Sequence, residues 1–118
     1  MAIEFSNEFG EITVSAKMIS EMAATVAETC YGVVGMASKN ATDGIVSLLK
    51  GDNKGKGIKV SFQDNKAVVE LHIIVEFGIN INSICKSIAN RVRYNLETMA
   101  GVPVKAVNIR VEGIRVSE

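Results

Sequence analysis

The chain has 118 residues, of which 47% are hydrophobic and 22% are charged, and its 13 basic residues balance 13 acidic ones. That length suits a single domain spanning residues 1–118 with one hydrophobic core. A neutral chain lacks the cationic field that draws nucleic acid or anionic lipid to strongly basic proteins, so we expect no nucleic-acid partner. Low net charge also removes repulsion between copies, which favours a homo-oligomer.

No stretch of the chain predicts a membrane span. The longest stretch without a charged residue is residues 29–38, whereas a spanning helix needs about 20 apolar residues. The N-terminal segment has early acidic residues and no basic region before an apolar run, unlike a secretory signal. We therefore predict a cytoplasmic protein that associates with a membrane only through a partner.

Cysteine and histidine are scarce. The two cysteines, Cys30 and Cys85, fall at apolar positions of helical patterns, as buried free thiols commonly do. With one histidine and no Cys-x-x-Cys pair, the chain cannot supply the usual four ligands of a structural zinc site. We expect no disulfide framework, no metal and no cofactor.

The first half of the chain predicts a strand, a helix and a second strand. Ile12 and Val14 alternate with polar residues, the pattern of a half-buried strand. A helix follows, capped by Ser15 and closed by Gly32. Residues 33–37 predict a short buried strand. The apolar stripe of the helix is Met18, Ile19, Met22, Ala23, Val26 and Cys30.

The middle of the chain predicts a short helix, a solvated loop and a β-hairpin. Residues 43–49 suit the helix and residues 51–57 the loop. Residues 58–62 and 69–77 then alternate apolar and polar side chains around the turn formers Asp64 and Asn65.

A long helix and a final strand complete the pattern. The helix begins at Asn82 or Ser83 and ends before Gly101, with an apolar stripe at Ile84, Cys85, Ile88, Val92, Leu96 and Met99. Residues 107–111 then alternate as a strand. The phase slips at Gly113, as at a β-bulge, which moves two apolar residues to the other face, Ile114 and Val116.

The predicted order is β-α-β-(short α)-β-β-α-β. Two long helices, each apolar along one stripe, can cover one face of a mostly antiparallel sheet. We therefore predict an α+β fold, a two-layer sandwich with both long helices on one face of the sheet.

Three polar residues share one face of the long predicted strand: Glu70, His72 and Glu76. They are the nearest approach to an acid–base or metal-binding group in the chain. We favour the alternative of a solvated sheet face, whose acids pair across strands with Lys59 or Arg110. The cysteines belong to helical core stripes, away from the face of the only histidine, so no cysteine nucleophile is expected. We predict that the protein is not an enzyme.

Residues 50–59, KGDNKGKGIK, combine three glycines with four lysines: Lys50, Lys54, Lys56 and Lys59. Open backbone amides and ammonium groups suit anions. The order of residues is not that of a phosphate loop, and the segment precedes a strand where a phosphate loop opens a helix. We favour a solvated turn and keep a nucleic-acid or phosphoanion-binding module as the alternative function.

Residues 30–40, CYGVVGMASKN, contain a Gly-x-x-Gly arrangement like that of KH domains. The two intervening residues are valines, whereas a KH loop carries basic, exposed residues there. We therefore assign Val33 and Val34 to packing. Tyrosine and methionine are frequent in interfaces. The candidate contacts for a partner protein are Tyr31, Met36, Lys39 and Asn40.

No single segment of the chain identifies a protein family, but several segments taken together do. They are residues 10–40, GIKVSF at 57–62, VEFGININ at 75–82, ETMAG at 97–101 and VKAVNIRVEGIRV at 104–116. Over nearly the whole chain they resemble the alkaline shock protein family, the envelope stress response proteins of Gram-positive bacteria. The chain departs from the family pattern at Phe77, where tyrosine is usual, and at Ala89, where glutamine is common.

The CYGVVGMASKN form is similar to the short branch of this family, often encoded beside a kinase that is related to dihydroxyacetone kinases and phosphorylates fatty acids. The resemblance implies a non-enzymatic accessory or scaffold protein linked to envelope stress or lipid metabolism. It also implies a protein partner such as that fatty-acid-kinase-like protein. The family has no established catalytic residues, so the resemblance supplies no active site.

Overall fold

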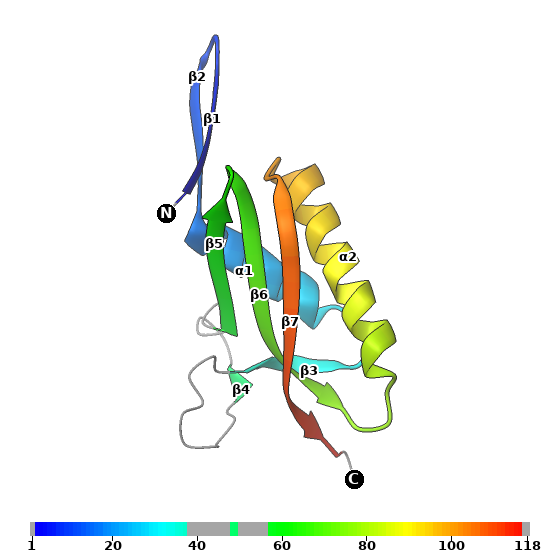
Figure 1. Cartoon of the computed structure of the whole chain (residues 1–118). Coiled ribbons are helices and arrows are strands. Elements are labelled where there is room, and N and C mark those ends of the chain that lie inside the picture. Colours follow the sequence, from blue (N-terminus) through cyan, green and yellow to red (C-terminus); the bar gives the residue numbers. More distant parts are fainter. Residues whose placement is uncertain (1, 38–47, 50–56, 117–118) are drawn as a thin grey trace.

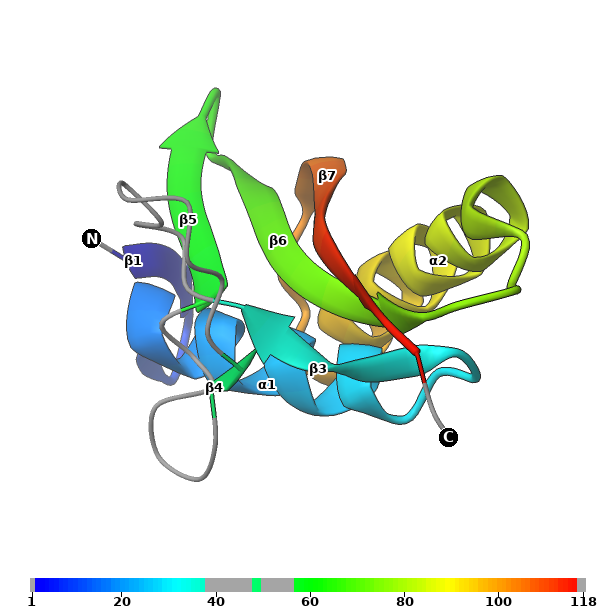
Figure 2. The ribbon, with the colours of Figure 1, turned by 90° about the horizontal axis from the view of Figure 1, so that it is seen from below.

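The computed structural model describes residues 2–37, 48–49 and 57–116 (Figure 1). The elements in chain order are β1 (Ala2–Asn7), β2 (Gly10–Ser15), α1 (Ala16–Glu28), β3 (Val33–Ala37), β4 (Leu48–Leu49), β5 (Ile58–Gln63), β6 (Lys66–Glu76), α2 (Ile81–Met99) and β7 (Val104–Arg115). Both helices lie on one side of the curved main sheet (Figure 2). The predicted α+β two-layer sandwich is confirmed.

Strand β6 organises the main sheet. β5 pairs antiparallel with the first part of β6 and β3 with its last part, and β7 runs parallel along the opposite edge. The two-residue β4 extends the sheet by pairing antiparallel with β3. Among the described strands only the β6–β7 pair is parallel, so the sheet is mostly antiparallel, as predicted.

The hydrophobic core lies between the sheet and the helices. Alternate residues of β6 point toward the helices, and residues three or four apart on each helix point back, as the two periodicities require. The side chains that meet there are fully buried: Val69, Leu71, Ile73 and Val75 of β6, Ile19, Ala23 and Ala27 of α1, and Ile88, Val92 and Leu96 of α2. Each of the larger ones contributes about 1.5–3 kcal/mol by leaving water.

β3 and β5 pair with successive parts of the same edge of β6, and Gly57 lies where the one strand replaces the other. A Cβ atom at Gly57 would lie 2.7 Å from the carbonyl oxygen of Ala37 and 3.4 Å from that of His72. Only glycine allows backbones to approach this closely. The prediction of a solvated loop at Gly57 is therefore wrong, because this residue is buried. Residues 50–56 lie outside the described part of the chain.

Both helices begin at a capping side chain. Ser15 Oγ accepts a hydrogen bond from the Met18 backbone N–H at 3.1 Å, which confirms the predicted start of α1. α2 begins at Ile81, slightly earlier than predicted, because Asn80 Oδ1 accepts from the Ser83 backbone N–H at 3.0 Å.

β1 and β2 form a separate two-stranded hairpin that projects beyond the main sheet (Figure 1). The alternation of apolar residues predicted β2, but β1 was missed. Ile3 is buried, and Phe5 and Val14 pack against the core, so the base of the hairpin is anchored. This anchor matters because an isolated two-stranded hairpin is marginally stable in water.

The predicted short helix at residues 43–49 is wrong where the structure describes it. Leu48 and Leu49 form β4, opposite Ala37 and Met36 of β3. A short apolar run does not distinguish helix from strand, and pairing with β3 satisfies backbone groups at that edge of the sheet. Residues 43–47 lie outside the described part.

Gly32 reverses the chain between α1 and β3. The helix itself ends at Glu28 with Thr29 as its C-cap, so Gly32 does not close the helix as predicted. Its φ of +89° is in the left-handed region. A Cβ atom there would overlap the Ile84 side chain and lie 3.1 Å from Ile79 Cδ1. The start of α2 therefore packs directly on this turn.

Replacing Gly32 by alanine should lower the free energy of unfolding by about 2–4 kcal/mol, from backbone strain and overpacking together. Gly78 is the matched control, because its φ is +93° and no atom lies within 4 Å of a Cβ built there. Gly78→Ala should lose only the strain, about 1–2 kcal/mol. Denaturant unfolding measures both variants, and equal losses would contradict the packing of α2 on Gly32.

Candidate functional site

Charged side chains of β6 and β7 cluster on the outer face of the sheet, away from the helices. His72 Nε2 lies 3.1 Å from Glu70 Oε2, and His72 Nδ1 lies 3.6 Å from Glu112 Oε1. Arg110 Nε donates to Glu70 Oε1 at 3.4 Å. The parallel register places Arg110 beside His72, and the alternation of β7 puts Glu112, the extra residue of the bulge, on the same face.

The geometry of this cluster does not suit catalysis or metal binding. Its two carboxylates contact opposite nitrogens of the His72 ring, so they do not converge on one point as metal ligands or an acid–base pair must. Across the described residues, no group of three or more His, Cys, Asp or Glu side chains could hold a metal ion. His72 Nδ1 is buried without a hydrogen bond. The cluster ties β6 to β7.

Glu70 is the titratable residue that this cluster perturbs most clearly. The hydrogen bond from His72 holds the pKa of Glu70 below its ordinary value of 4.5, and Arg110 acts in the same direction. Partial burial opposes both effects but does not reverse them. Glu70 is therefore held as a carboxylate that binds His72 and Arg110.

The predicted pairing of Glu70 with Arg110 is confirmed, and the other predicted members of this face lie apart. Glu76 is exposed at the end of β6, and Lys59 is exposed on β5; neither makes an ion pair within the described part of the chain. Sequence reasoning missed Glu112. The alternation along residues 107–112 was the available signal, since it places Glu112 on the same face as Arg110.

The two cysteines lie in or next to the helices rather than on the outer sheet face. Both thiols are free, with Cys30 buried and Cys85 half-buried. Arg91 Nη1 lies 3.7 Å from Cys30 Sγ, which links the end of α1 to α2. Burial raises the pKa of the Cys85 thiol, which disfavours the nucleophilic thiolate.

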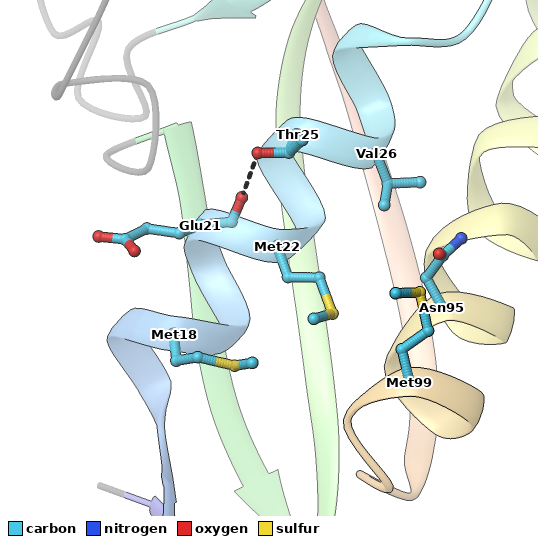
Figure 3. A pocket seen from close by; sticks show the side chains of 7 residues that line it. All are labelled: Met18, Glu21, Met22, Thr25, Val26, Asn95 and Met99. Carbon is cyan, nitrogen blue, oxygen red and sulfur yellow. Dashed lines mark hydrogen bonds between the residues drawn. The ribbon is translucent and has the colours of Figure 1, made fainter.

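An apolar groove of about 420 Å³ lies between α1 and α2 (Figure 3). We call it the methionine groove; it is lined by Met18, Glu21, Met22, Thr25 and Val26 of α1 and by Asn95 and Met99 of α2. The helical periodicity predicts that its three methionines, Met18, Met22 and Met99, lie on the apolar stripes that face the core. Met18 and Met99 are instead exposed, because they lie at the flanks where the two helices diverge.

The polar side chains of the methionine groove are already hydrogen-bonded to their own helices. Thr25 Oγ1 donates to the Glu21 carbonyl oxygen at 2.9 Å, and Asn95 Nδ2 donates to the Arg91 carbonyl oxygen at 2.8 Å. These groups therefore offer little to a polar ligand. The methionines supply flexible, polarisable apolar surface that adapts to the shape of an occupant.

The predicted contacts at residues 30–40 divide into three groups. Tyr31 is exposed, so its role as a partner contact stays a prediction. Met36 is fully buried in the core, because its side chain lies on the inner face of β3, and the prediction that it contacts a partner at the surface is wrong. Lys39 and Asn40 lie outside the described residues.

The predicted anion contacts cannot be assembled into a site from the described residues. Lys59 is exposed on β5, opposite Glu70 of β6. The other three lysines of that prediction, Lys50, Lys54 and Lys56, lie outside the described part of the chain.

The fold and these surfaces define a small α+β domain with an apolar groove on its helical layer and an ion-paired outer sheet face. The model of the alkaline shock protein family, a family with a cell envelope-related function, matches residues 4–116. The chain belongs to this family, and the resemblance of its segments is confirmed.

Similar proteins occur in Gram-positive bacteria. The uncharacterized protein YloU of Bacillus subtilis is 35% identical over 99% of this chain and 98% of its own. The uncharacterized protein Spy1614 of Streptococcus pyogenes is 34% identical over 98% of this chain and 97% of its own. YqhY of Bacillus subtilis is 28% identical over 90% and 78%. No solved structure matches significantly. In the described part of this chain, neither helix has the length and apolar character needed to cross a membrane.

Replacing Glu70 by glutamine should lower the free energy of unfolding near neutral pH by about 0.5–1 kcal/mol. Because folding lowers the pKa of Glu70, its contribution is present above the ordinary value of 4.5 and is lost as pH falls through the folded value. The stabilities of the wild type and Glu70→Gln should therefore converge in acid. Urea unfolding over that pH range measures the gap. Glu11→Gln is the control, because Glu11 is exposed on β2 and makes no ion pair within the described residues. A gap that persists unchanged into acid would contradict the assignment.

Proposed function

We propose that this protein is a non-enzymatic accessory protein of the cell envelope that acts by binding a protein partner and by self-association. The observation that carries the proposal is the methionine groove, an open apolar surface contributed by two helices. The diverging carboxylates around His72 support a structural role for the polar cluster rather than a chemical one.

The methionine groove fits an amphipathic helix of a partner protein. Helix-binding grooves take up apolar side chains at positions i, i+3, i+4 and i+7, and methionine-rich surfaces accommodate such helices. Met18, Met22 and Val26 recur every four residues along α1 and so form one apolar wall of the groove, and Met99 faces them from α2. Glu21 lies at the groove and is exposed, so it favours a partner helix that carries a basic residue beside its apolar face.

The resemblance of residues 30–40 to the short branch of the family makes a fatty-acid-kinase-like protein the first partner to test. This role places the protein in the cytoplasm, next to envelope or lipid metabolism, with any membrane association provided by the partner. It also agrees with the cell envelope-related function of the family.

Replacing both Met18 and Met99 by glutamate should reduce recovery of the partner at least tenfold, because each carboxylate would have to be desolvated against the partner's apolar side chains. The measurement is affinity capture from the native host, followed by direct binding of the purified partner. Both methionines are exposed, so the variant should fold.

Tyr94→Glu is the control, since Tyr94 is an exposed apolar residue on α2 that does not line the groove. It should capture the partner as the wild type does. Equal recovery with the methionine variant would exclude the groove as the binding surface.

A further inference from the structure

Five large apolar side chains are exposed at one end of the molecule, away from the methionine groove. They are Tyr31 (83% exposed), Phe77 (71%), Val116 (66%), Ile114 (53%) and Ile81 (37%). We call this set the end surface. Such a concentration of exposed apolar residues is typical of an interaction site.

Backbone contacts bring the segments of the end surface together. The Glu76 backbone N–H donates to the Gly32 carbonyl oxygen at 2.9 Å, and the Phe77 backbone N–H donates to the Arg115 carbonyl oxygen at 2.9 Å. The turn before β3, the ends of β6 and β7, and the start of α2 thus meet at the lower end of Figure 1. Figure 2 views the molecule from this side.

The β-bulge in β7 places Ile114 on this surface. Val111 lies beside Ile73, but Gly113 lies beside Ile74, so one extra residue is inserted between them. Ile114 is therefore the neighbour of Val75, whose side chain points toward the helices. Without the bulge, Gly113 would occupy that place. Ile114 thus continues the apolar inner face of the sheet beyond the part that the helices cover.

The charges at the end surface indicate what covers it. Glu76 and Arg115 lie side by side in the β6–β7 register, and both are exposed. They alternate onto the outer face of the sheet and are next in sequence to Phe77 and Ile114, so they border the end surface. Within the residues that the structure describes, neither makes an ion pair. One anion next to one cation is self-complementary across a two-fold axis, as a symmetric dimer requires. A nucleic acid or an anionic lipid surface would require an excess of cations.

We propose that the end surface is the self-association interface of this protein, where a second copy binds about a two-fold axis. Phe77, Ile114 and Val116 pack against the same residues of the second copy, and at the border of this contact Glu76 of each copy pairs with Arg115 of the other. The neutral chain presents no net repulsion to this contact. The inference rests on the self-association part of the proposed function and names its surface.

Sedimentation equilibrium of charge variants tests this interface. The wild type should dimerise. Glu76→Arg and Arg115→Glu should each weaken dimerisation roughly tenfold or more, because each places two like-charged contacts at the interface. The double variant Glu76→Arg/Arg115→Glu should recover to within about threefold of the wild type, because it restores opposite charges. Lys17→Glu, an exposed cation on α1, is the control and should change nothing.

An apolar variant provides an independent check. Phe77→Ser should weaken the dimer as strongly as the charge reversals, and Tyr94→Ser, outside the end surface, should not. Circular dichroism confirms that each variant is folded. A wild type that remains monomeric at high concentration would overturn the inference, as would a dimer insensitive to all these changes. So would a monomer whose binding to anionic vesicles depends on Phe77.

The outcomes also separate this inference from the proposed function. If the end-surface variants leave the dimer intact while the methionine-groove variant loses the partner, the end surface is not the dimer interface, but the groove still binds the partner. If Glu76→Arg/Arg115→Glu restores the dimer while no partner depends on the groove, the dimer interface is supported and the proposed partner binding is not.

Discussion

The parallel pairing of β6 with β7, and the bulge that interrupts it, is the constraint on which both the charged outer face and the end surface depend. β6 is paired along both edges, and the helices cover its inner face, whose side chains are fully buried, while its outer face carries the charged cluster. Glu112, the extra residue in β7, lies next to His72 on the outer face, and its insertion moves Ile114 to the inner face, beside Val75. The regular part of the pairing thus sets the polar cluster, and the bulge sets the apolar character of the end surface.

The two apolar surfaces lie at opposite ends of α2. Ile81 begins the helix at the end surface, and Met99 ends it in the methionine groove. At 1.5 Å per residue, about 27 Å of helix separates them. The sites proposed for a second copy and for a partner helix are therefore separate, so the proposed dimer and the proposed complex are sterically compatible.

The sequence predicted those elements whose periodicity matches their burial. The stripes of α1 and α2, apart from Met18 and Met99, follow from local pattern, as do the alternation along β6, the turn at Asp64 and Asn65 and the slip at Gly113. The structure bears these out. Both turn residues adopt positive φ, as a tight hairpin turn requires. The family resemblance could also be recognised from the sequence, because it depends on these same segments taken together.

What the sequence did not predict depends on contacts between distant segments. β1 is an exception, because its partner is the next strand and its alternating Ile3 and Phe5 were a local signal that was overlooked. Met36 resembled a surface contact but is buried, and Met18 and Met99 resembled core residues but line a groove. Methionine suits either environment, so its position is decided by how the helices pack, which no local pattern reports. Gly57 is fixed by two backbones that approach it from other strands.

In the proposed assembly, the second copy and the partner occupy different surfaces of this chain. Native mass spectrometry of the purified complex with the captured partner tests it most directly. We expect a complex that contains two copies of this chain and two of the partner. A complex with one copy of each, formed as the dimer dissociates, would show that both compete for the same surface and would contradict the claim.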